Sequence, residues 1–478
     1  MTARIWTGLG TVLLLAACAV GPDYTRPESP APPLWTEPIE NGLSAAPANA
    51  ELLAQWWTTL GDAQLTELVR RALAGNLDVQ AAQARVREAR ARRVIARAGF
   101  FPRLEAGASA SRADASDGLR NDSSNVGGSA GANDLYTAGL DASWEIDVFG
   151  GQRREFEAAT AELERSVSDL RDVLVIVAAE TALGYVDVRS FQARLAIAEA
   201  NLVAQEETVS LVDWRVQAGL ATELELERAR SNAAQTRAQI PALRTSLEQA
   251  RHGLAVLVGA APGALATELA EPRPIPRTPL EVAVGVPAQA LGQRPDVRRA
   301  EAELHAQTAR VGVATARAYP SLTALGSIGL EALTPGGLFD AGASTWRLAG
   351  NTAWVVFDAG AIRGGIEAED ALREQALAAF RASVLNALEE VEGALVAYAQ
   401  EQDRLRVLEG GAQSASRAVE LAQVQYGAGL VDFEIVLDSQ RSLYVLQEQV
   451  AVSERDVTGN LIRLYKALGG GWTPGASG

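Results

Sequence analysis

The sequence of this chain contains an internal duplication, which is visible in the aromatic and glycine residues that recur at corresponding positions of the two copies. Phe101-Pro102 recurs as Tyr319-Pro320, an offset of 218 residues, whereas later matches keep an offset of 210. A single change of offset between the first two predicted strands means that one loop differs in length. Duplication of this kind predicts a pseudo-symmetric assembly and not a catalytic cleft. The later matches include Tyr136 with Trp346, Trp144 with Trp354, and Ala218-Gly219-Leu220 with Ala428-Gly429-Leu430.

The composition excludes several classes of protein. There are 43 basic and 59 acidic side chains, a net charge of −16, which argues against binding the nucleic-acid backbone. One Cys, one Met and two His leave little room for disulfides, thiolate catalysis or histidine metal sites. After the N-terminus no apolar run of about 18 residues occurs, so any membrane-spanning part must be made of strands.

The N-terminus has the pattern of an export signal. Residues 1–17 contain Arg4 and then the apolar stretch 5–15, too short for a transmembrane span. Leu15-Ala16-Ala17-Cys18 matches the bacterial lipobox, which predicts that the Cys18 thiol carries a covalent diacylglyceryl group. The alternative is a plain secretory signal with an incidental Cys. Ala19, in place of Asp, favours sorting to the outer membrane, and a Pro-rich extended tether follows over residues 18–60.

Four segments alternate apolar and polar residues with the period of a strand. They lie near residues 102–112 and 135–147 in copy one, and near 320–330 and 346–357 in copy two. This alternation is typical of outer-membrane strands, although a soluble sandwich with one wet face shares it. The aromatic pairs Tyr136/Trp144 and Trp346/Trp354 are each spaced by roughly 26 Å of strand. That spacing matches an apolar band of about 25 Å flanked by aromatic girdles.

Four strands cannot close a barrel, because small barrels need about eight. A membrane-spanning sheet therefore requires several chains, and three chains would supply twelve strands. The polar stretches 113–134 and 332–345 are rich in turn residues and fit external loops.

In each copy of the repeat, a long helix is predicted after the second strand. About 65 residues between Gln152 and the Ala218-Gly219 turn lack proline, and residues 363–428 form their twin. At 1.5 Å per residue each helix would run roughly 95 Å. Each ends at a glycine suited to a left-handed C-terminal cap, so helical hairpins with tips at 217–222 and 427–432 are expected.

These elements define the predicted organisation. The fold is mainly α with a small membrane β part, and the chain is internally duplicated. Repeat 1 covers 61–270, a Pro-rich linker 271–291, repeat 2 292–472, and a tail 473–478.

Several short motifs together resemble the lipoprotein branch of the TolC-like outer-membrane efflux family. The resemblance covers nearly the whole mature chain, and the joint pattern is highly specific. It rests on Cys18-Ala19-Val20-Gly21-Pro22-Asp23-Tyr24, Trp56-Trp57, Arg294-Pro295-Asp296-Val297, Tyr319-Pro320-Ser321 and Tyr465-Lys466-Ala467-Leu468-Gly469-Gly470-Gly471-Trp472.

The resemblance implies a homotrimer with a shared twelve-stranded barrel in the outer membrane and a periplasmic helical tunnel. It also implies a passive exit duct without cofactor, working with a periplasmic adaptor and an inner-membrane RND-type transporter. The hairpin tips Ala218-Gly219-Leu220 and Ala428-Gly429-Leu430 would contact the adaptor. Asp438 matches a pore carboxylate of the family, while the second such position holds Ile435, with Glu434 beside it.

Other interpretations of these residues stay open. Asp438 could instead be a surface carboxylate paired with Arg441. Asp78 and Asp296 fit helix caps or packing groups, Trp56 and Trp57 fit hydrophobic plugs, and His252 and His305 fit surface or packing roles.

The leading function is the outer-membrane channel of an efflux pump. The duct of a type I protein secretion system would have the same fold. A lipidated periplasmic adaptor would have one hairpin between β domains, which disagrees with two hairpins and duplicated strands. An enzyme fits least, since no nucleophile–base pair or metal cluster is found in the sequence.

Overall fold

A computed structural model describes residues 19–28, 32–46, 49–113, 133–279 and 282–472. The chain divides into two compact units, each discontinuous in sequence. The strand unit comprises Met1–Pro27, Arg87–Arg165 and Glu301–Ala379, and the hairpin unit comprises Glu28–Val86, Ser166–Ala300 and Phe380–Gly478. Each unit therefore takes residues from both sequence repeats, so the repeats are not separate compact domains. The reason is that equivalent elements of the two copies pack against each other.

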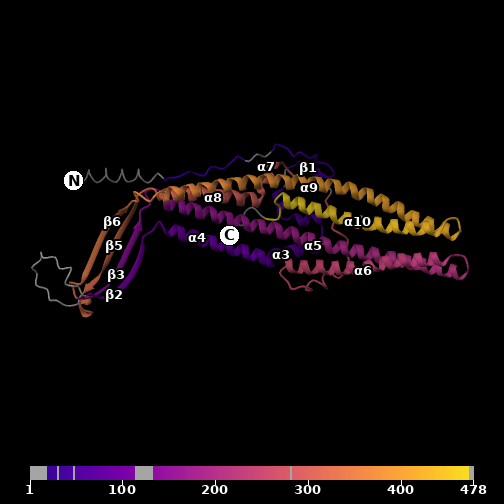
Figure 1. Ribbon diagram of the computed structural model, residues 1–478, viewed down its shortest axis with the longest axis horizontal. Helices are drawn as coiled ribbons and strands as arrows, with labels where there is room; N and C mark the ends of the chain where they lie inside the picture. Colours follow the sequence, from indigo (N-terminus) through magenta and orange to yellow (C-terminus); the bar gives the residue numbers. More distant parts are fainter. Residues whose placement is uncertain (1–18, 29–31, 47–48, 114–132, 280–281, 473–478) are drawn as a thin grey trace, which may run out of the picture. The chain divides into compact units, whose positions relative to one another are not determined.

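The strand unit contains one four-stranded antiparallel sheet (Figure 1). Its order is β2-β3-β5-β6, so the copies join where β3 pairs with β5. At that joint Gly139 lies opposite Gly329, and a Cβ on either would sit 2.8 Å from a carbonyl oxygen of the other strand. Only glycine permits this approach. The strands are β2 Arg103–Ala113, β3 Asn133–Glu145, β5 Ser321–Ala332 and β6 Ser344–Ala353.

The sheet exposes apolar side chains of the kind that globular proteins bury. Leu104, Leu140, Ile328, Trp346 and Leu348 are all solvent-exposed. An extended exposed apolar surface marks an interaction with lipid or with protein. Most of the predicted external loop, residues 114–132, lies outside the described residues.

The helices repeat in length between the two copies, as duplication requires. Both α5 and α9 have 67 residues, both α6 and α10 have 35, and both α4 and α8 have 22. In the hairpin unit α6 runs back along α5 and α10 along α9 (Figure 1). Pro241 lies inside α6, which continues through it. The bounds are α4 Leu77–Ala98, α5 Gly151–Gln217, α6 Glu223–Leu257, α8 Pro295–Ala316, α9 Ala361–Gly427 and α10 Phe433–Ala467.

Short elements surround the main core of the hairpin unit. Trp56 is fully buried and stacks on Tyr465, with ring centroids 5.4 Å apart, while Trp57 is buried beside it. Both tryptophans pack in this core. The short elements are α2 Ala50–Ala54, η1 Trp56–Leu60, α3 Ala63–Gly75 and α7 Pro287–Gln293; β1 Leu43–Ser44 pairs in parallel with β4 Val282–Ala283. In the strand unit, η3 Gly336–Phe339 lies between β5 and β6. Among the helices in the described part of the chain, none has the length and hydrophobicity that a transmembrane helix requires.

Arg294 connects three helices of the hairpin unit. Its buried guanidinium donates to the Ala467 carbonyl oxygen at 2.6 Å, to Asp296 Oδ2 at 2.8 Å and to Glu390 Oε2 at 2.6 Å. Burial alone would raise the pKa of Asp296, but the hydrogen bonds and charge of Arg294 outweigh burial and lower it. Asp78, the equivalent residue of copy one, is exposed, and Asn76 caps α4 in its place by accepting from the Asp78 and Val79 amides.

We expect Asp296→Asn to lower stability at pH 7 by about 1–3 kcal/mol, because it removes charged hydrogen bonds from a buried guanidinium. A depressed folded-state pKa stabilises above the unfolded value and loses its effect as the pH falls through the folded value. The thermal midpoints of the variant and the wild type should therefore converge as the pH is lowered past 3.8, the ordinary value. Asp78→Asn is the matched control and should change little at any pH. If the difference between the two thermal midpoints stays constant as the pH is lowered, this role for the ion pair is wrong.

Candidate functional site: the ends of the helical hairpins

Each hairpin tip is closed by backbone hydrogen bonds around one glycine. Gly219 has φ +71°, and the Leu220 amide donates to the Arg215 carbonyl oxygen at 2.7 Å. In copy two Gly429 has φ +73°, and the Leu430 amide donates to the Gln425 carbonyl oxygen at 2.9 Å. This is the Schellman geometry, which satisfies the last helix carbonyls without any side chain.

The helices that leave the tips begin differently in the two copies. Thr222 caps α6, because its hydroxyl accepts from the Glu225 amide at 3.3 Å. Asp432 stands at the equivalent position before α10, but its side chain makes no capping hydrogen bond. The two returning helices therefore differ in how their first turn is satisfied, with a side-chain cap in copy one only.

The tips present apolar side chains to solvent. Leu220 is 68% exposed and Leu430 is 75% exposed, and the neighbouring residues Ala218, Gly219, Ala428 and Gly429 are exposed too. Because the backbone is already satisfied, these side chains contribute nothing to closing the turn. They form a surface suited to contact with another protein.

Just behind the tips the two hairpins pack against each other. Tyr426 and Phe433 have ring centroids 5.3 Å apart, and both are buried. They belong to a small apolar cluster that also contains Val212, Leu226, Ala229, Ala422, Val436 and Leu437. This cluster, called here the tip cluster, is separate from the main core of the hairpin unit.

Polar contacts flank the tip cluster and also run from one hairpin to the other. The Arg215 guanidinium lies 4.5 Å from the Tyr426 ring centroid and donates to the Tyr426 carbonyl oxygen at 3.3 Å. The Tyr426 hydroxyl donates to Glu225 Oε2 at 3.4 Å. Burial and the nearby Glu225 charge raise the pKa of Tyr426. The sequence analysis did not identify this contact, since a lone Arg in a charged helix carries no signal of its partner.

The predicted pore carboxylates both lie on the exposed side of α10. Glu434 forms an ion pair with Arg228 of the other hairpin at 3.5 Å. Asp438 is exposed, and within the described residues it has no ion-pair partner. The expected alternative partner, Arg441, donates instead to Asn232 Oδ1 at 2.9 Å. The structure thus leaves Asp438 facing solvent, and its pore role stays a prediction.

The predicted girdle aromatics fall into two pairs. The Trp144 indole donates to the Phe100 carbonyl oxygen, and the Trp354 indole donates to the Ala318 carbonyl oxygen, both at 3.1 Å. These two hydrogen bonds are equivalent under the duplication. Trp354 lies one residue beyond β6, which ends at Ala353, so the predicted fourth strand, 346–357, is displaced toward its N-terminus. Tyr136 is half-buried on β3, and Trp346 is exposed on β6.

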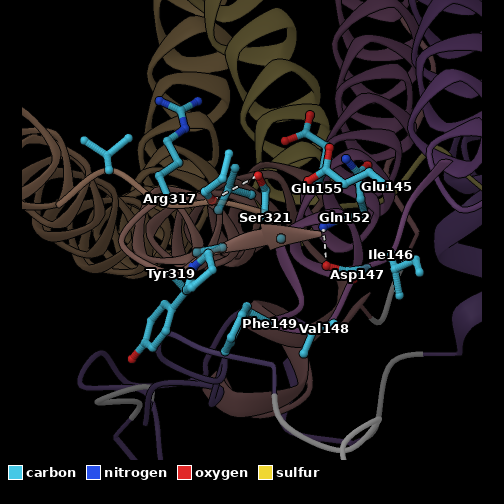
Figure 2. A pocket seen from close by; sticks show the side chains of 16 residues that line it. Glu145, Ile146, Asp147, Val148, Phe149, Gln152, Glu155, Arg317, Tyr319 and Ser321 are labelled. Atoms are coloured by element: carbon cyan, nitrogen blue, oxygen red, sulfur yellow. Dashed lines mark hydrogen bonds between the residues drawn. The ribbon is translucent and has the colours of Figure 1, made fainter. Parts of the chain in front are cut away.

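A pocket of about 490 Å³ lies in the strand unit where strands give way to helices (Figure 2). Its lining includes Glu145, Glu155, Arg317 and Tyr319. Asp147 at its edge accepts from the Gln152 and Arg153 amides at 3.1 and 3.0 Å, and so caps α5. The lining carries acidic and basic side chains, and the helix start at its edge is already capped by Asp147.

The predicted lipidation site, Cys18, lies outside the described residues. The residues that follow it belong to the strand unit, where the Val20 amide donates to the Phe149 carbonyl oxygen at 3.0 Å.

Comparison with known proteins finds one family and several relatives that match most of the chain. The family model for outer membrane efflux proteins matches residues 68–260 and 286–470. The pyoverdine export outer membrane protein OpmQ of Pseudomonas putida is 35% identical over 461 residues, covering 96% of each chain. Nodulation protein T of Rhizobium leguminosarum bv. trifolii is 31% identical over 467 residues, covering 97% of this chain and 96% of the relative. The solved outer-membrane channel OprN is 33% identical with a TM-score of 0.89, covering 96% of this chain and all of that one.

An open sheet with one exposed apolar face, two long helical hairpins and these similarities together define a class, the outer-membrane efflux channels. The chain belongs to the outer membrane efflux protein family. It is therefore an outer-membrane component of an efflux pump, and the predicted family, fold class and location are confirmed.

Proposed function

We propose that three copies of this chain assemble into a passive exit duct for drugs or other solutes. Each copy contributes four strands to a twelve-stranded barrel and two hairpins to a periplasmic tunnel. The observation that carries the proposal is the open sheet: β2 and β6 have no strand partner on their outer sides among the described residues. Unpaired edges and exposed apolar faces are costly for an isolated sheet, and both would be covered if neighbouring copies continued it in lipid.

Two adjacent residues of β5 test which face of the sheet meets lipid. Ile328 is on the apolar face and Ser327 on the polar face, opposite Asp141 and Arg347. We expect Ile328→Lys to abolish insertion, because a charge on a lipid-facing strand costs about 2–4 kcal/mol at the membrane midplane. Ser327→Lys should insert normally and change single-channel conductance. Equal amounts of both variants as folded trimers in outer-membrane fractions would refute the proposed orientation.

We further propose that the duct works with a periplasmic adaptor and an inner-membrane RND-type transporter, and that the adaptor binds the hairpin tips. The exposed Leu220 and Leu430 support this, since their side chains are free of any role in closing the turns.

The double variant Leu220→Asp, Leu430→Asp should reduce copurification of the channel with its adaptor by at least ten-fold while leaving the trimer intact. Val407→Asp, at an exposed apolar position within α9 and away from the tips, controls for added surface charge. Adaptor recovery that is equal for the double variant and the control would place the contact elsewhere.

The tips are also proposed to form the gate, with Asp438 and Glu434 facing the pore. The contacts from Arg215 to Tyr426 and from Arg228 to Glu434 tie the hairpins of one protomer together behind the tips. Opening the duct would then move such hairpin pairs away from those of neighbouring protomers.

Asp438→Ala should lower cation selectivity in single-channel recordings, because it would remove one negative charge per protomer from the proposed gate. Glu420→Gln, at an exposed position of α9, is the control for loss of surface charge. If Asp438→Ala keeps wild-type conductance and selectivity, Asp438 does not belong to the gate.

Covalent lipid on Cys18 completes the proposal. Acyl chains add about 0.8 kcal/mol per buried CH₂, and two chains or more give durable anchoring. The channel itself is proposed to need no cofactor and to catalyse no reaction, in keeping with relatives that are named as export and efflux components.

A further inference from the structure

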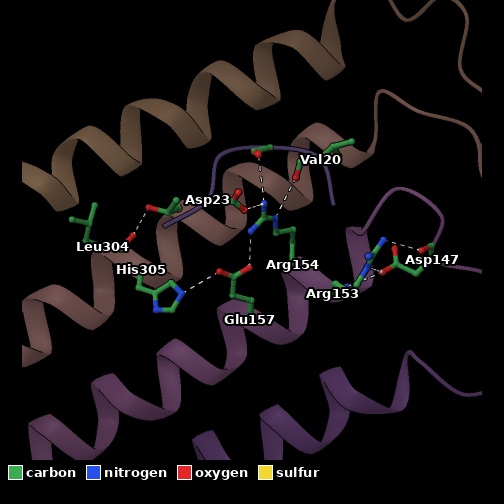
Figure 3. Close-up of polar contacts among 10 residues, drawn as sticks. Val20, Asp23, Asp147, Arg153, Arg154, Glu157, Leu304 and His305 are labelled. Carbon is green, nitrogen blue, oxygen red and sulfur yellow. Dashed lines mark hydrogen bonds and ion pairs between the residues drawn. The ribbon is translucent and has the colours of Figure 1, made fainter. Parts of the chain in front are cut away.

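The segment that follows the lipidation site is held in a built seat of the strand unit, which we call the strap seat. The strap is residues 19–26, and the seat is formed by the first turns of α5, by α8 and by the loop before α5 (Figure 3). The strap was predicted to be part of an extended tether without a core of its own. Its contacts are more numerous than a tether needs.

Arg154 is the centre of the seat. Its side chain is 5% exposed, and its guanidinium donates to the Val20 carbonyl oxygen at 3.2 Å, to the Gly21 carbonyl oxygen at 3.5 Å and to Asp23 Oδ1 at 2.6 Å. A fourth contact at 2.8 Å goes to Glu157 on its own helix. Burial disfavours the charged guanidinium, but the carboxylates of Asp23 and Glu157 outweigh burial and raise the pKa of Arg154. Three of these four hydrogen bonds of the buried guanidinium go to the strap.

Three glycines make the close fit possible. A Cβ on Gly21 would lie 2.5 Å from the Gly312 Cα, and Gly21 has φ +90°. A Cβ on Gly312 would lie 2.7 Å from the Arg154 Cγ, and one on Gly150 would lie 2.6 Å from the Ala19 Cα. The strap backbone therefore rests directly on the backbone of α8 and of the loop, which a loosely attached tether does not require.

A second set of contacts holds the far end of the strap. The Tyr24 ring stacks on His305 with centroids 4.3 Å apart, and its hydroxyl donates to Glu301 Oε1 at 3.3 Å. Arg26 pairs with Glu301 at 3.0 Å, and His305 in turn lies 3.1 Å from Glu157. The polar network thus starts on the strap at Asp23, passes through the seat and returns to the strap at Tyr24.

We propose that the strap seat is a docking site for the chain's own acylated end, and that docking sets where the lipid enters the membrane. This rests on the lipidation of Cys18 proposed above. Ala19 packs against Gly150 in the loop that joins β3 to α5, and it follows Cys18 directly in the sequence. Holding Ala19 there would limit how far from this loop an acyl group on Cys18 could reach. The acyl chains would then enter the bilayer at a fixed position relative to the end of β3.

Without the strap seat, a long segment of chain would separate the lipid anchor from the folded part of the protein. Among the described residues, the next buried side chain along the chain is Trp35. A flexible segment of that length spans on the order of 20 Å in root-mean-square terms, so the acyl chains could sample much of the protein's surroundings. A seated strap removes this freedom before insertion and favours productive assembly.

The docking is tested by amide hydrogen exchange of the full-length protein in detergent, read over residues 19–26. Gly21→Ala should speed exchange there by at least ten-fold, since a methyl group meets the α8 backbone. Gly263→Ala is the matched control, because Gly263 also has φ +90° but nothing lies within 4 Å of its added Cβ. Asp23→Asn should speed exchange as well, with Glu28→Gln, outside the network, as its control. Wild-type protection in both Gly21→Ala and Asp23→Asn would overturn the docking.

The placement of the lipid is tested on the same variants in cells. Radiolabelled palmitate should be incorporated equally into wild type, Gly21→Ala and Gly263→Ala, while folded trimer in the outer membrane falls several-fold for Gly21→Ala alone. If Gly21→Ala shows fast exchange over the strap but a wild-type amount of folded trimer, the strap does not position the lipid for assembly. Wild type that takes up no label would overturn the lipidation itself, and the exchange measurement would still decide the docking on its own.

Discussion

The pairing of β3 with β5 is the interaction on which the rest of the strand unit depends. It joins the two copies of the duplicated sequence, and at its centre the backbones meet directly because Gly139 and Gly329 face each other with no space for a side chain. A register shift of one residue would move every apolar side chain to the opposite face. With the register set at this seam, the difference in length between the copies falls in the loops, where it does not disturb the strands.

In the hairpin unit, too, the two copies are aligned by a small number of specific contacts. Equal helix lengths in the two copies place their glycine turns at equivalent positions, and a separate apolar cluster behind the tips joins one hairpin to the other. Buried arginines then tie helix ends that lie far apart in sequence, as Arg294 does for α8, α9 and α10. Long helices that could slide along each other are thus held at a few specific points.

Sequence reasoning recovered the parts that follow from periodicity and turn chemistry. Strands, hairpins and glycine caps all leave local patterns, and the structure has them within a few residues of the expected places. It did not recover the contacts of Arg154 with the strap or of Arg215 with Tyr426. These join residues more than 130 and 200 positions apart, and one arginine among many gives no sign of its partner. The compact units also differ from the repeats, because packing between copies leaves no trace in either copy alone.

The way the tips are closed has a consequence for how such channels diversify. Two backbone hydrogen bonds and one glycine are sufficient to turn the chain, so the side chains on either side of that glycine are released from folding constraints. Their identity can drift, or be exchanged between homologous channels, without redesign of the helices beneath. Substitutions at these exposed positions can therefore change the chemistry of the tip surface while the turn and its helices keep their geometry.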